Sequence, residues 1–127
     1  MPHKTSLVVD DEPSVRNFII AVLQSDGFQT IEAQNGVQAL ELLRKHGTDV
    51  DLLVSDIKMP LMDGIALALS VARDYPAIII LLMTAYADQR ERASNLDALI
   101  HDVILKPFTL AEIKAAVADA LAARAKR

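Results

Sequence analysis

Four short hydrophobic runs, each of which stops at a polar or charged residue, constrain the fold of this chain more than any other feature. They occupy residues 6–9, 51–55, 77–83 and 103–105. Short apolar runs separated by helical stretches are typical of the buried strands of a parallel sheet. In such a sheet each connection between strands contains a helix, and the crossovers are right-handed. The pattern therefore predicts an α/β fold.

The segments between these runs predict the helices that would cover the sheet. Apolar spacing and turn-forming residues place five helices at about 13–26, 36–47, 65–74, 89–95 and 109–121. The segment 28–33 alternates partly between apolar and polar residues and adds a fifth strand at one edge. The helix at 89–95 has a thin apolar stripe, so we expect it to be the least firmly packed. No linker or repeat interrupts this order, which predicts a single domain over residues 1–127.

Composition narrows the class of protein. The chain has 127 residues, 52% of them hydrophobic, which is enough to bury a core. A net charge of −4 offers no basic surface, so no direct nucleic-acid partner is expected, and the basic residues at 124–127 are expected to form a solvated helix end. The longest apolar run, 77–83, is too short to span a bilayer, and no signal peptide is recognised. We therefore expect a cytoplasmic protein with no membrane partner.

Chemically reactive side chains follow the ends of the expected strands. Asp10 and Asp11 follow the first run, Asp56 follows the second, and Lys106 follows the last. Thr84 ends the run at 77–83. Because ligands bind at the carboxyl ends of parallel strands, we expect these side chains to converge on one edge of the sheet. Neighbouring carboxylates repel one another unless a cation lies among them, and an ammonium or hydroxyl can hold phosphoryl oxygens. The pattern predicts a divalent cation, a phosphoryl group and one reactive aspartate.

These motifs resemble those of response-regulator receiver domains, which act in bacterial two-component signalling and chemotaxis. The matching segments come in the family's order and at its usual spacings, and together they cover almost the whole chain. They are residues 7–12, 56–64, 84–85 and 106–108. The resemblance implies the flavodoxin-like fold, a doubly wound parallel sheet of five strands in the order 2-1-3-4-5 with five helices.

The resemblance also implies a function. Asp56 would accept a phosphoryl group from a phosphohistidine on a sensor histidine kinase or a histidine phosphotransferase. Thr84 and Lys106 would hold the phosphoryl oxygens. Phosphorylation would then switch the face formed by the fourth helix, the last strand and the last helix, where a partner docks. The chain would not be an enzyme beyond catalysing its own phosphorylation and dephosphorylation.

The same resemblance implies a metal site. Asp11 and Asp56 would bind Mg²⁺ or Mn²⁺ through their carboxylates. Lys58 would contribute its backbone carbonyl, and Asp10 would support the metal through a water molecule. This assignment agrees with the preference of magnesium for oxygen ligands.

The sequence departs from the family pattern at one position. Receivers usually carry an aromatic residue three positions before the lysine, and this chain has Val103 there. Tyr86 is a candidate for part of that switching role, and the alternative is a partly exposed loop aromatic. By family analogy, Lys58 and Tyr86 flank the path of the water that hydrolyses the phosphoryl group. Their bulk predicts slow hydrolysis.

Three other functions fit parts of the pattern. A haloacid-dehalogenase-like phosphatase uses a second aspartate two residues after its nucleophile, where this chain has Lys58. A flavodoxin-like cofactor binder needs a phosphate-binding loop after the first strand, where the acidic residues 10–12 would repel a phosphate. A receiver-like interaction module that works without phosphorylation stays open because of Val103. A homodimer through the last strand and the last helices also stays open.

Overall fold

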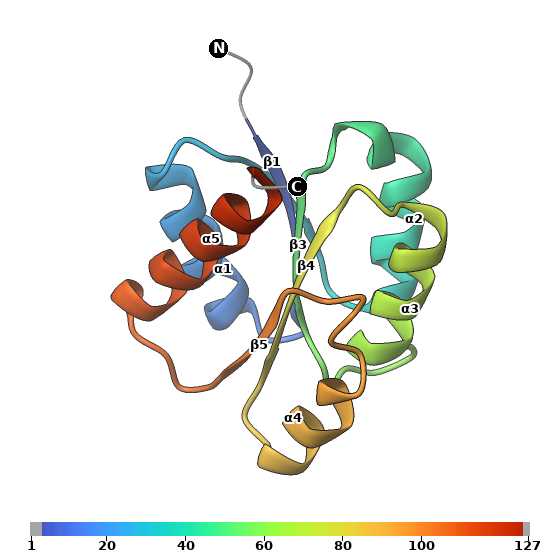
Figure 1. The fold of residues 1–127 in the computed structure, drawn as a ribbon. Helices are drawn as coiled ribbons and strands as arrows, with labels where there is room; N and C mark the ends of the chain where they lie inside the picture. Colours follow the sequence, from blue (N-terminus) through green and yellow to red (C-terminus); the bar gives the residue numbers. More distant parts are fainter. Residues whose placement is uncertain (1–3, 126–127) are drawn as a thin grey trace.

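The computed structural model describes residues 4–125 and contains a five-stranded sheet with helices on both faces (Figure 1). The strands are β1 (Thr5–Val9), β2 (Gln29–Ala33), β3 (Leu52–Asp56), β4 (Ile79–Thr84) and β5 (Asp102–Leu105). The helices are α1 (Pro13–Ser25), α2 (Gly36–His46), α3 (Gly64–Asp74), α4 (Ala87–Ser94) and α5 (Leu110–Ala125), and a 3-10 turn, η1 (Gly47–Asp49), precedes β3. All strand pairs are parallel, in the order β2-β1-β3-β4-β5. The predicted fold is therefore confirmed.

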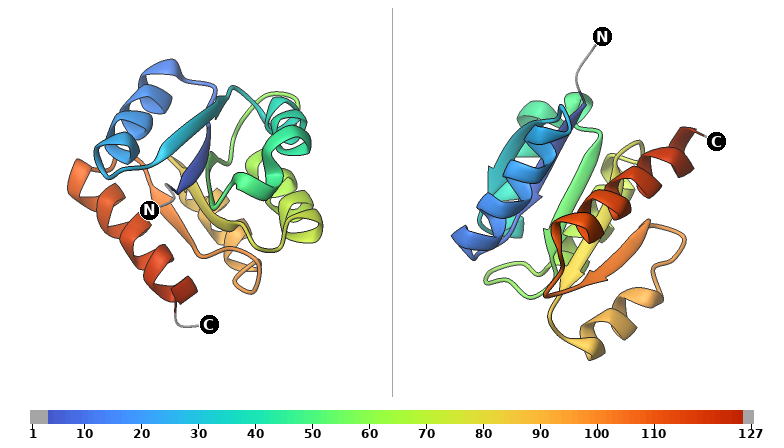
Figure 2. Two further views of the ribbon diagram at one scale, coloured as in Figure 1. Left: turned by 90° about the horizontal axis from the view of Figure 1, so that it is seen from above. Right: turned by 90° about the vertical axis from the view of Figure 1, so that its left-hand side faces the viewer.

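Alternate residues of the central strands pack against the two layers of helices. Leu7 and Val9 of β1 belong to a cluster shared with α2 and α3, whereas Val8 belongs to a cluster shared with α1 and α5. Figure 2 shows α1 and α5 on one side of the sheet and α2 and α3 on the other. Because both faces are covered, β1, β3 and β4 are buried along their whole length. This arrangement explains why their sequences are continuous apolar runs.

Polar side chains mark where several helices begin. Asn35 accepts a hydrogen bond from the backbone N–H of Gln38, and Asp63 accepts one from that of Ala66. Asp63 therefore starts α3 at Gly64, one residue earlier than predicted. At α5, Thr109 and Glu112 exchange hydrogen bonds of 3.0 and 3.1 Å between side chain and backbone, which is the expected capping box.

The burial of side chains in α4 agrees with the sequence-based expectation, whereas that in α1 differs from it in part. Among the described residues of α4, Ala93 alone is buried, so the predicted weak packing of this helix is confirmed. In α1 the predicted apolar stripe included Phe18, but this side chain is 39% exposed and stacks on Phe108 with a centroid separation of 6.3 Å. Arg16 occupies the buried face of α1 instead.

Two further sequence-based expectations concern membrane-spanning helices and the basic cluster near residue 127. Within residues 4–125, no helix is long and apolar enough to cross a membrane. The side chains of the basic cluster at 124–127 lie outside the described residues, so the predicted solvated helix end stays a prediction.

Candidate functional site

The register of the sheet brings the ends of four strands to one edge. Ser55 pairs with Val9, Asp56 with Met83, and Thr84 with Leu105. Asp56 and Thr84, which end β3 and β4, therefore lie close to Asp10 and Lys106, which directly follow β1 and β5. Lys106 is tied into the same edge, because its backbone N–H donates to the carbonyl of Thr84 at 2.8 Å.

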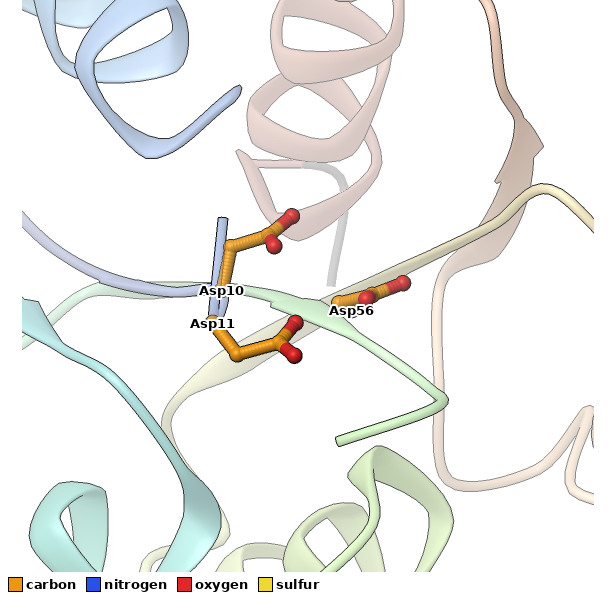
Figure 3. Close-up of side chains that lie close together, drawn as sticks. All are labelled: Asp10, Asp11 and Asp56. Carbon is orange, nitrogen blue, oxygen red and sulfur yellow. The ribbon is translucent and has the colours of Figure 1, made fainter. Parts of the chain in front are cut away.

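Three carboxylates gather at this edge. One oxygen each of Asp10, Asp11 and Asp56 lies within 4.8 Å of the others. Figure 3 shows Asp10 and Asp11 directing their carboxylates to the side on which Asp56 lies. Asp10 is fully buried and Asp56 is 6% exposed, whereas Asp11 is exposed. One cation could therefore be held between two buried acids and one acid that faces solvent.

Lys106 supplies positive charge to the two buried acids. Its Nζ atom lies 2.9 Å from Oδ2 of Asp10 and 3.3 Å from Oδ1 of Asp56. Burial would lower the pKa of Lys106, but the hydrogen bond to Asp10 and the charge of Asp56 outweigh burial and raise this pKa. Lys106 is therefore a permanent cation at physiological pH.

Asp56 is the most perturbed acid of the site. Burial raises the pKa of Asp56 to about 6, and the negative charges of Asp10 and Asp11 add to this rise. The charge of Lys106 lowers the same pKa without cancelling the rise. The ammonium of Lys106 thus does not offset the combined effect of burial and of the two neighbouring carboxylates on the pKa of Asp56. An additional cation beside Asp56 would favour its ionised form.

The loop between β3 and α3 returns to Asp56. A Cβ atom on Gly64 would lie 2.1 Å from the carbonyl oxygen of Asp56, and Gly64 donates to the carbonyl of Ile57 at 2.7 Å. Only glycine fits such a close approach of two backbone segments. This crossing holds Lys58 next to the acids, where it lines a cavity of about 260 Å³ together with Asp11 and Asp56.

Ala85, Tyr86 and Lys58 also line that cavity. The ammonium of Lys58 lies 4.7 Å from the centre of the Tyr86 ring, which is a cation–π contact. Ala85 and Asp56 line the same cavity, and the small side chain of Ala85 leaves room there. Tyr86 is 47% exposed, so in this structure it is a partly exposed loop aromatic.

Thr84 is close in sequence to the cavity but does not line it. Its side chain is fully buried, and its Oγ1 accepts a hydrogen bond of 3.1 Å from the backbone N–H of Tyr86. The hydroxyl of Thr84 donates to the carbonyl of Tyr86 at 3.5 Å, so donation to a phosphoryl oxygen requires its proton to turn away from that carbonyl. Val103, at the position where an aromatic residue was expected from the family pattern, is buried in the core cluster beneath α4.

Arg16 is a site residue that sequence reasoning missed. It is buried, its Nη1 donates to the backbone carbonyl of Asp10 at 2.8 Å, and its Nε lies 3.0 Å from Oε1 of Glu32. These bonds tie α1 and β2 to the turn that carries Asp10. The available signal was its spacing, because Arg16 precedes Ile19 by three residues on the buried stripe of α1.

The donor set fits a hard divalent cation. Carboxylate oxygens and a backbone carbonyl are the ligands that magnesium and manganese prefer, and the residues that line the cavity include no cysteine, methionine or histidine. Lys106 already balances part of the charge of Asp10 and Asp56. Asp11 is therefore the acid with the least compensation among the three.

A family model described as "Response regulator receiver domain" matches residues 6–118. The chain belongs to this family. The site therefore belongs to a receiver domain of the two-component type, and the resemblance noted in the sequence is confirmed.

Curated relatives place such a receiver in different contexts. The chain is 37% identical over 119 residues to sporulation initiation phosphotransferase F of Bacillus subtilis, covering 92% of this chain and 93% of that protein. It is 38% identical over 118 residues to sensor kinase CckA of Brucella abortus, covering 92% of this chain but only 12% of the kinase. The chain thus matches nearly all of one relative and a small part of the other.

A solved structure supports the same assignment. The response regulator protein TrrA from Thermotoga maritima, determined in complex with Mg²⁺–BeF, superimposes with a TM-score of 0.80. Its sequence is 32% identical, and the match covers 92% of this chain and 98% of that chain. The receiver fold is therefore shared over almost the full length of both chains.

Proposed function

We propose that this receiver accepts a phosphoryl group on Asp56 from a phosphohistidine of a sensor histidine kinase or a histidine phosphotransferase. The observation that carries the proposal is the convergence of Asp10, Asp11 and Asp56 with Lys106, three of which, Asp11, Asp56 and Lys106, line one small cavity. The relatives named as a sensor kinase and a phosphotransferase support a role among such donors.

The metal of the proposed reaction is Mg²⁺ or Mn²⁺. Asp11 and Asp56 would hold it through carboxylates, Lys58 through its backbone carbonyl, and Asp10 through a water molecule. The indirect role of Asp10 agrees with its burial and its hydrogen bond to Lys106. When bound, the cation offsets negative charge on the transferring phosphoryl oxygens. The complex of TrrA with Mg²⁺–BeF supports the choice of metal.

In the proposed step, an oxygen of Asp56 attacks the phosphorus atom of the phosphohistidine. The phosphorus–nitrogen bond breaks, and its electron pair returns to the imidazole ring of the donor. Lys106 stabilises the phosphoryl oxygens, and it can do so because its ammonium already lies 3.3 Å from Asp56. The chain itself promotes only this transfer and the later hydrolysis, so we do not class it as an enzyme.

Phosphorylation would act on α4 and its surroundings. The product adds roughly −1.5 to −2 charge and new acceptor oxygens beside Thr84. Thr84 would turn its hydroxyl proton from the carbonyl of Tyr86 toward these oxygens, and the hydrogen bond that it accepts from the N–H of Tyr86 would pull the start of α4 with it. Weak packing makes α4 suited to a second position. The face of α4, β5 and α5 would then change for a partner, without an aromatic residue at Val103.

A second candidate is a receiver-like interaction module that docks without phosphorylation. The specific observation in its favour is the aliphatic Val103 at the switch position, buried in the core. Under either function we expect a cytoplasmic setting, no direct nucleic-acid contact and no membrane partner. A homodimer through β5 and the last helices stays a prediction that sedimentation of the phosphorylated chain would test.

Intact mass spectrometry tests the proposed function. The chain is incubated with acetyl phosphate or phosphoramidate, with Mg²⁺ and with EDTA, and Asp56→Asn is compared with wild type. Asp74→Asn, which removes an exposed carboxylate of α3, is the matched control. We expect a magnesium-dependent gain of one phosphoryl group in wild type and control and none in Asp56→Asn. The absence of an adduct with every donor would favour the docking module.

A further inference from the structure

Leu61 combines two features that rarely occur together. Its φ angle is 69°, in the left-handed region that a leucine adopts only at a cost. Its side chain is 82% exposed, so burial within the domain does not offset that cost. A glycine at this position would relieve the backbone and remove the exposed apolar group. The leucine side chain therefore does not serve the stability of the domain.

The loop around Leu61 directs this side chain outward. Met62 donates to the carbonyl of Pro60 at 2.8 Å, which closes a tight turn with Leu61 at its centre. Met59 is buried, and Met62 packs against the core and against Gly36. The flanking methionines fill the inward positions. Leu61 is left as the exposed apolar residue at the tip of the turn.

The position of this turn connects Leu61 with the phosphoacceptor. Both ends of the loop meet at Asp56, because Gly64 crosses its carbonyl and donates to Ile57. The loop between β3 and α3 can be followed in light green in the right-hand view of Figure 2. Leu61 is three residues from Lys58, which lines the cavity, and three from Gly64, which abuts Asp56, so its Cα atom lies within about 11 Å of each. Leu61 is therefore part of the short loop that borders the cavity, which is the entrance to Asp56.

A protein that donates a phosphoryl group must cover this entrance. Asp56 is 6% exposed and lies at the base of a cavity of about 260 Å³, so the donor must insert one side chain and rest its surface on the surrounding loops. A small-molecule donor needs no such support. The contact surface of the protein donor thus extends over the loop that carries Leu61.

We propose that Leu61 is a recognition residue for the protein donor, and that its side chain enters an apolar depression beside the donor's phosphohistidine. This inference rests on the proposed function of Asp56. An apolar side chain that is exposed before binding and buried afterwards stabilises a complex by the area it removes from water. Its preformed turn also limits the conformational freedom lost on binding.

The test compares a protein donor with a small-molecule donor. The protein donor is the autophosphorylated kinase of the source organism that labels the wild-type chain fastest, and the small donor is acetyl phosphate with Mg²⁺. The variants are Leu61→Ala, Leu61→Gly and Leu61→Met. Leu61→Ala keeps the backbone strain and removes the apolar bulk, Leu61→Gly removes both, and Leu61→Met keeps an apolar chain. Leu99→Ala is the matched control, because Leu99 is 45% exposed and lies before β5, at the opposite end of the sheet.

We expect Leu61→Ala and Leu61→Gly to lower kcat/KM for the protein donor by about tenfold. Leu61→Met and Leu99→Ala should stay close to wild type, and labelling by acetyl phosphate should be unchanged in all variants. Leu61→Gly should also raise Tm by about 2–6 °C, which separates lost recognition from lost folding.

Three results would overturn the inference. They are normal transfer from the protein donor to Leu61→Ala, an equal loss of labelling with acetyl phosphate, and failure of every kinase on a wild-type chain that acetyl phosphate labels. A wild-type chain that no donor labels would instead overturn the proposed function itself. The two failures are therefore distinguishable.

Discussion

Lys106 donates a 2.9 Å hydrogen bond to Asp10, although 96 positions separate the two residues along the chain. The strands that carry them are not neighbours, because β3 and β4 lie between β1 and β5. The side chain of Lys106 thus reaches across two strand ends to a fully buried acid. This contact joins the charge balance of the site to the stability of the fold.

Removal of this ammonium is expected to destabilise the protein. Lys106→Met leaves Asp10 buried beside Asp56 without compensation, so we expect the free energy of unfolding to fall by about 2–4 kcal/mol. Urea denaturation in EDTA measures the change. Lys114→Met is the control, since its ion pair with Asp26 spans 3.4 Å near the surface and is expected to matter by less than about 1 kcal/mol. Addition of Asp10→Asn should recover part of the loss, and no recovery would argue against charge imbalance as the cause.

The raised pKa of Asp56 predicts a pH dependence of stability. This pKa is about 6 in the folded chain and 3.8 as the reference value, so between these values the folded state binds the additional proton. The contribution of Asp56 to the free energy of unfolding therefore falls as the pH rises from about 3.8 to about 6. Without divalent cations, the gain in unfolding free energy from Asp56→Asn should grow by about 2–3 kcal/mol from about pH 4 to about pH 7. A gain that is the same at both ends would contradict this assignment.

Arg16 is expected to position the turn that carries the acids. Arg16→Met removes the donor to the carbonyl of Asp10 and should lower the free energy of unfolding by about 1–3 kcal/mol. Glu32→Gln keeps an oxygen acceptor at a half-exposed position and should have a smaller effect. Magnesium affinity, followed by thermal shift, should weaken in Arg16→Met because the turn loses its support. Unchanged stability and affinity would show that Arg16 is not needed for this turn.

Two buried serines predict opposite effects of the same substitution. Among residues 4–125, the Oγ of Ser6 has no hydrogen-bond partner, so Ser6→Ala should raise the unfolding free energy by about 1 kcal/mol. The Oγ of Ser55 donates to the carbonyl of Asp56 at 2.9 Å, so Ser55→Ala should lower it by about 1 kcal/mol. Chemical denaturation of both variants tests the pair. Destabilisation by Ser6→Ala would indicate a partner for its hydroxyl, such as a buried water.

The contact of Lys58 with Tyr86 predicts a long-lived phosphorylated form. The two side chains form part of the wall of the cavity that leads to Asp56, and their bulk would restrict the approach of water. Tyr86→Ala and Lys58→Ala should each shorten the lifetime of the aspartyl phosphate several-fold, whereas Tyr86→Phe keeps the ring and should preserve it. The lifetime is measured after removal of the phosphodonor. A lifetime of a few seconds for the aspartyl phosphate of the wild-type chain would contradict this hypothesis.

The placement of the acids was predictable because it depends on the order of strands. Runs that end at Asp10, Asp56 and Lys106 determine which side chains reach the edge of a parallel sheet, whatever their rotamers. Helix ends were predictable where a side chain caps the backbone, as Thr109 does with Glu112.

Other features depend on tertiary packing and were not predictable. The burial of Arg16 follows from a carbonyl of another element that accepts its hydrogen bond. The bond between the Oγ1 of Thr84 and the N–H of Tyr86 depends on a rotamer that a strand-end pattern does not specify. The left-handed backbone of Leu61 is imposed by the closure of its loop and runs against the preference of leucine.

Lys106 follows β5, the last strand in the sequence, and this order has a consequence for synthesis. Because the chain is synthesised from its N-terminus, Asp10, Asp11 and Asp56 leave the ribosome long before Lys106 does. Until then, closing β1, β3 and β4 around the acids would bury negative charge without a counter-ion. We therefore expect the nascent chain to delay burial of its acidic residues until the last strand arrives, so that the phosphoacceptor pocket and the complete sheet form together.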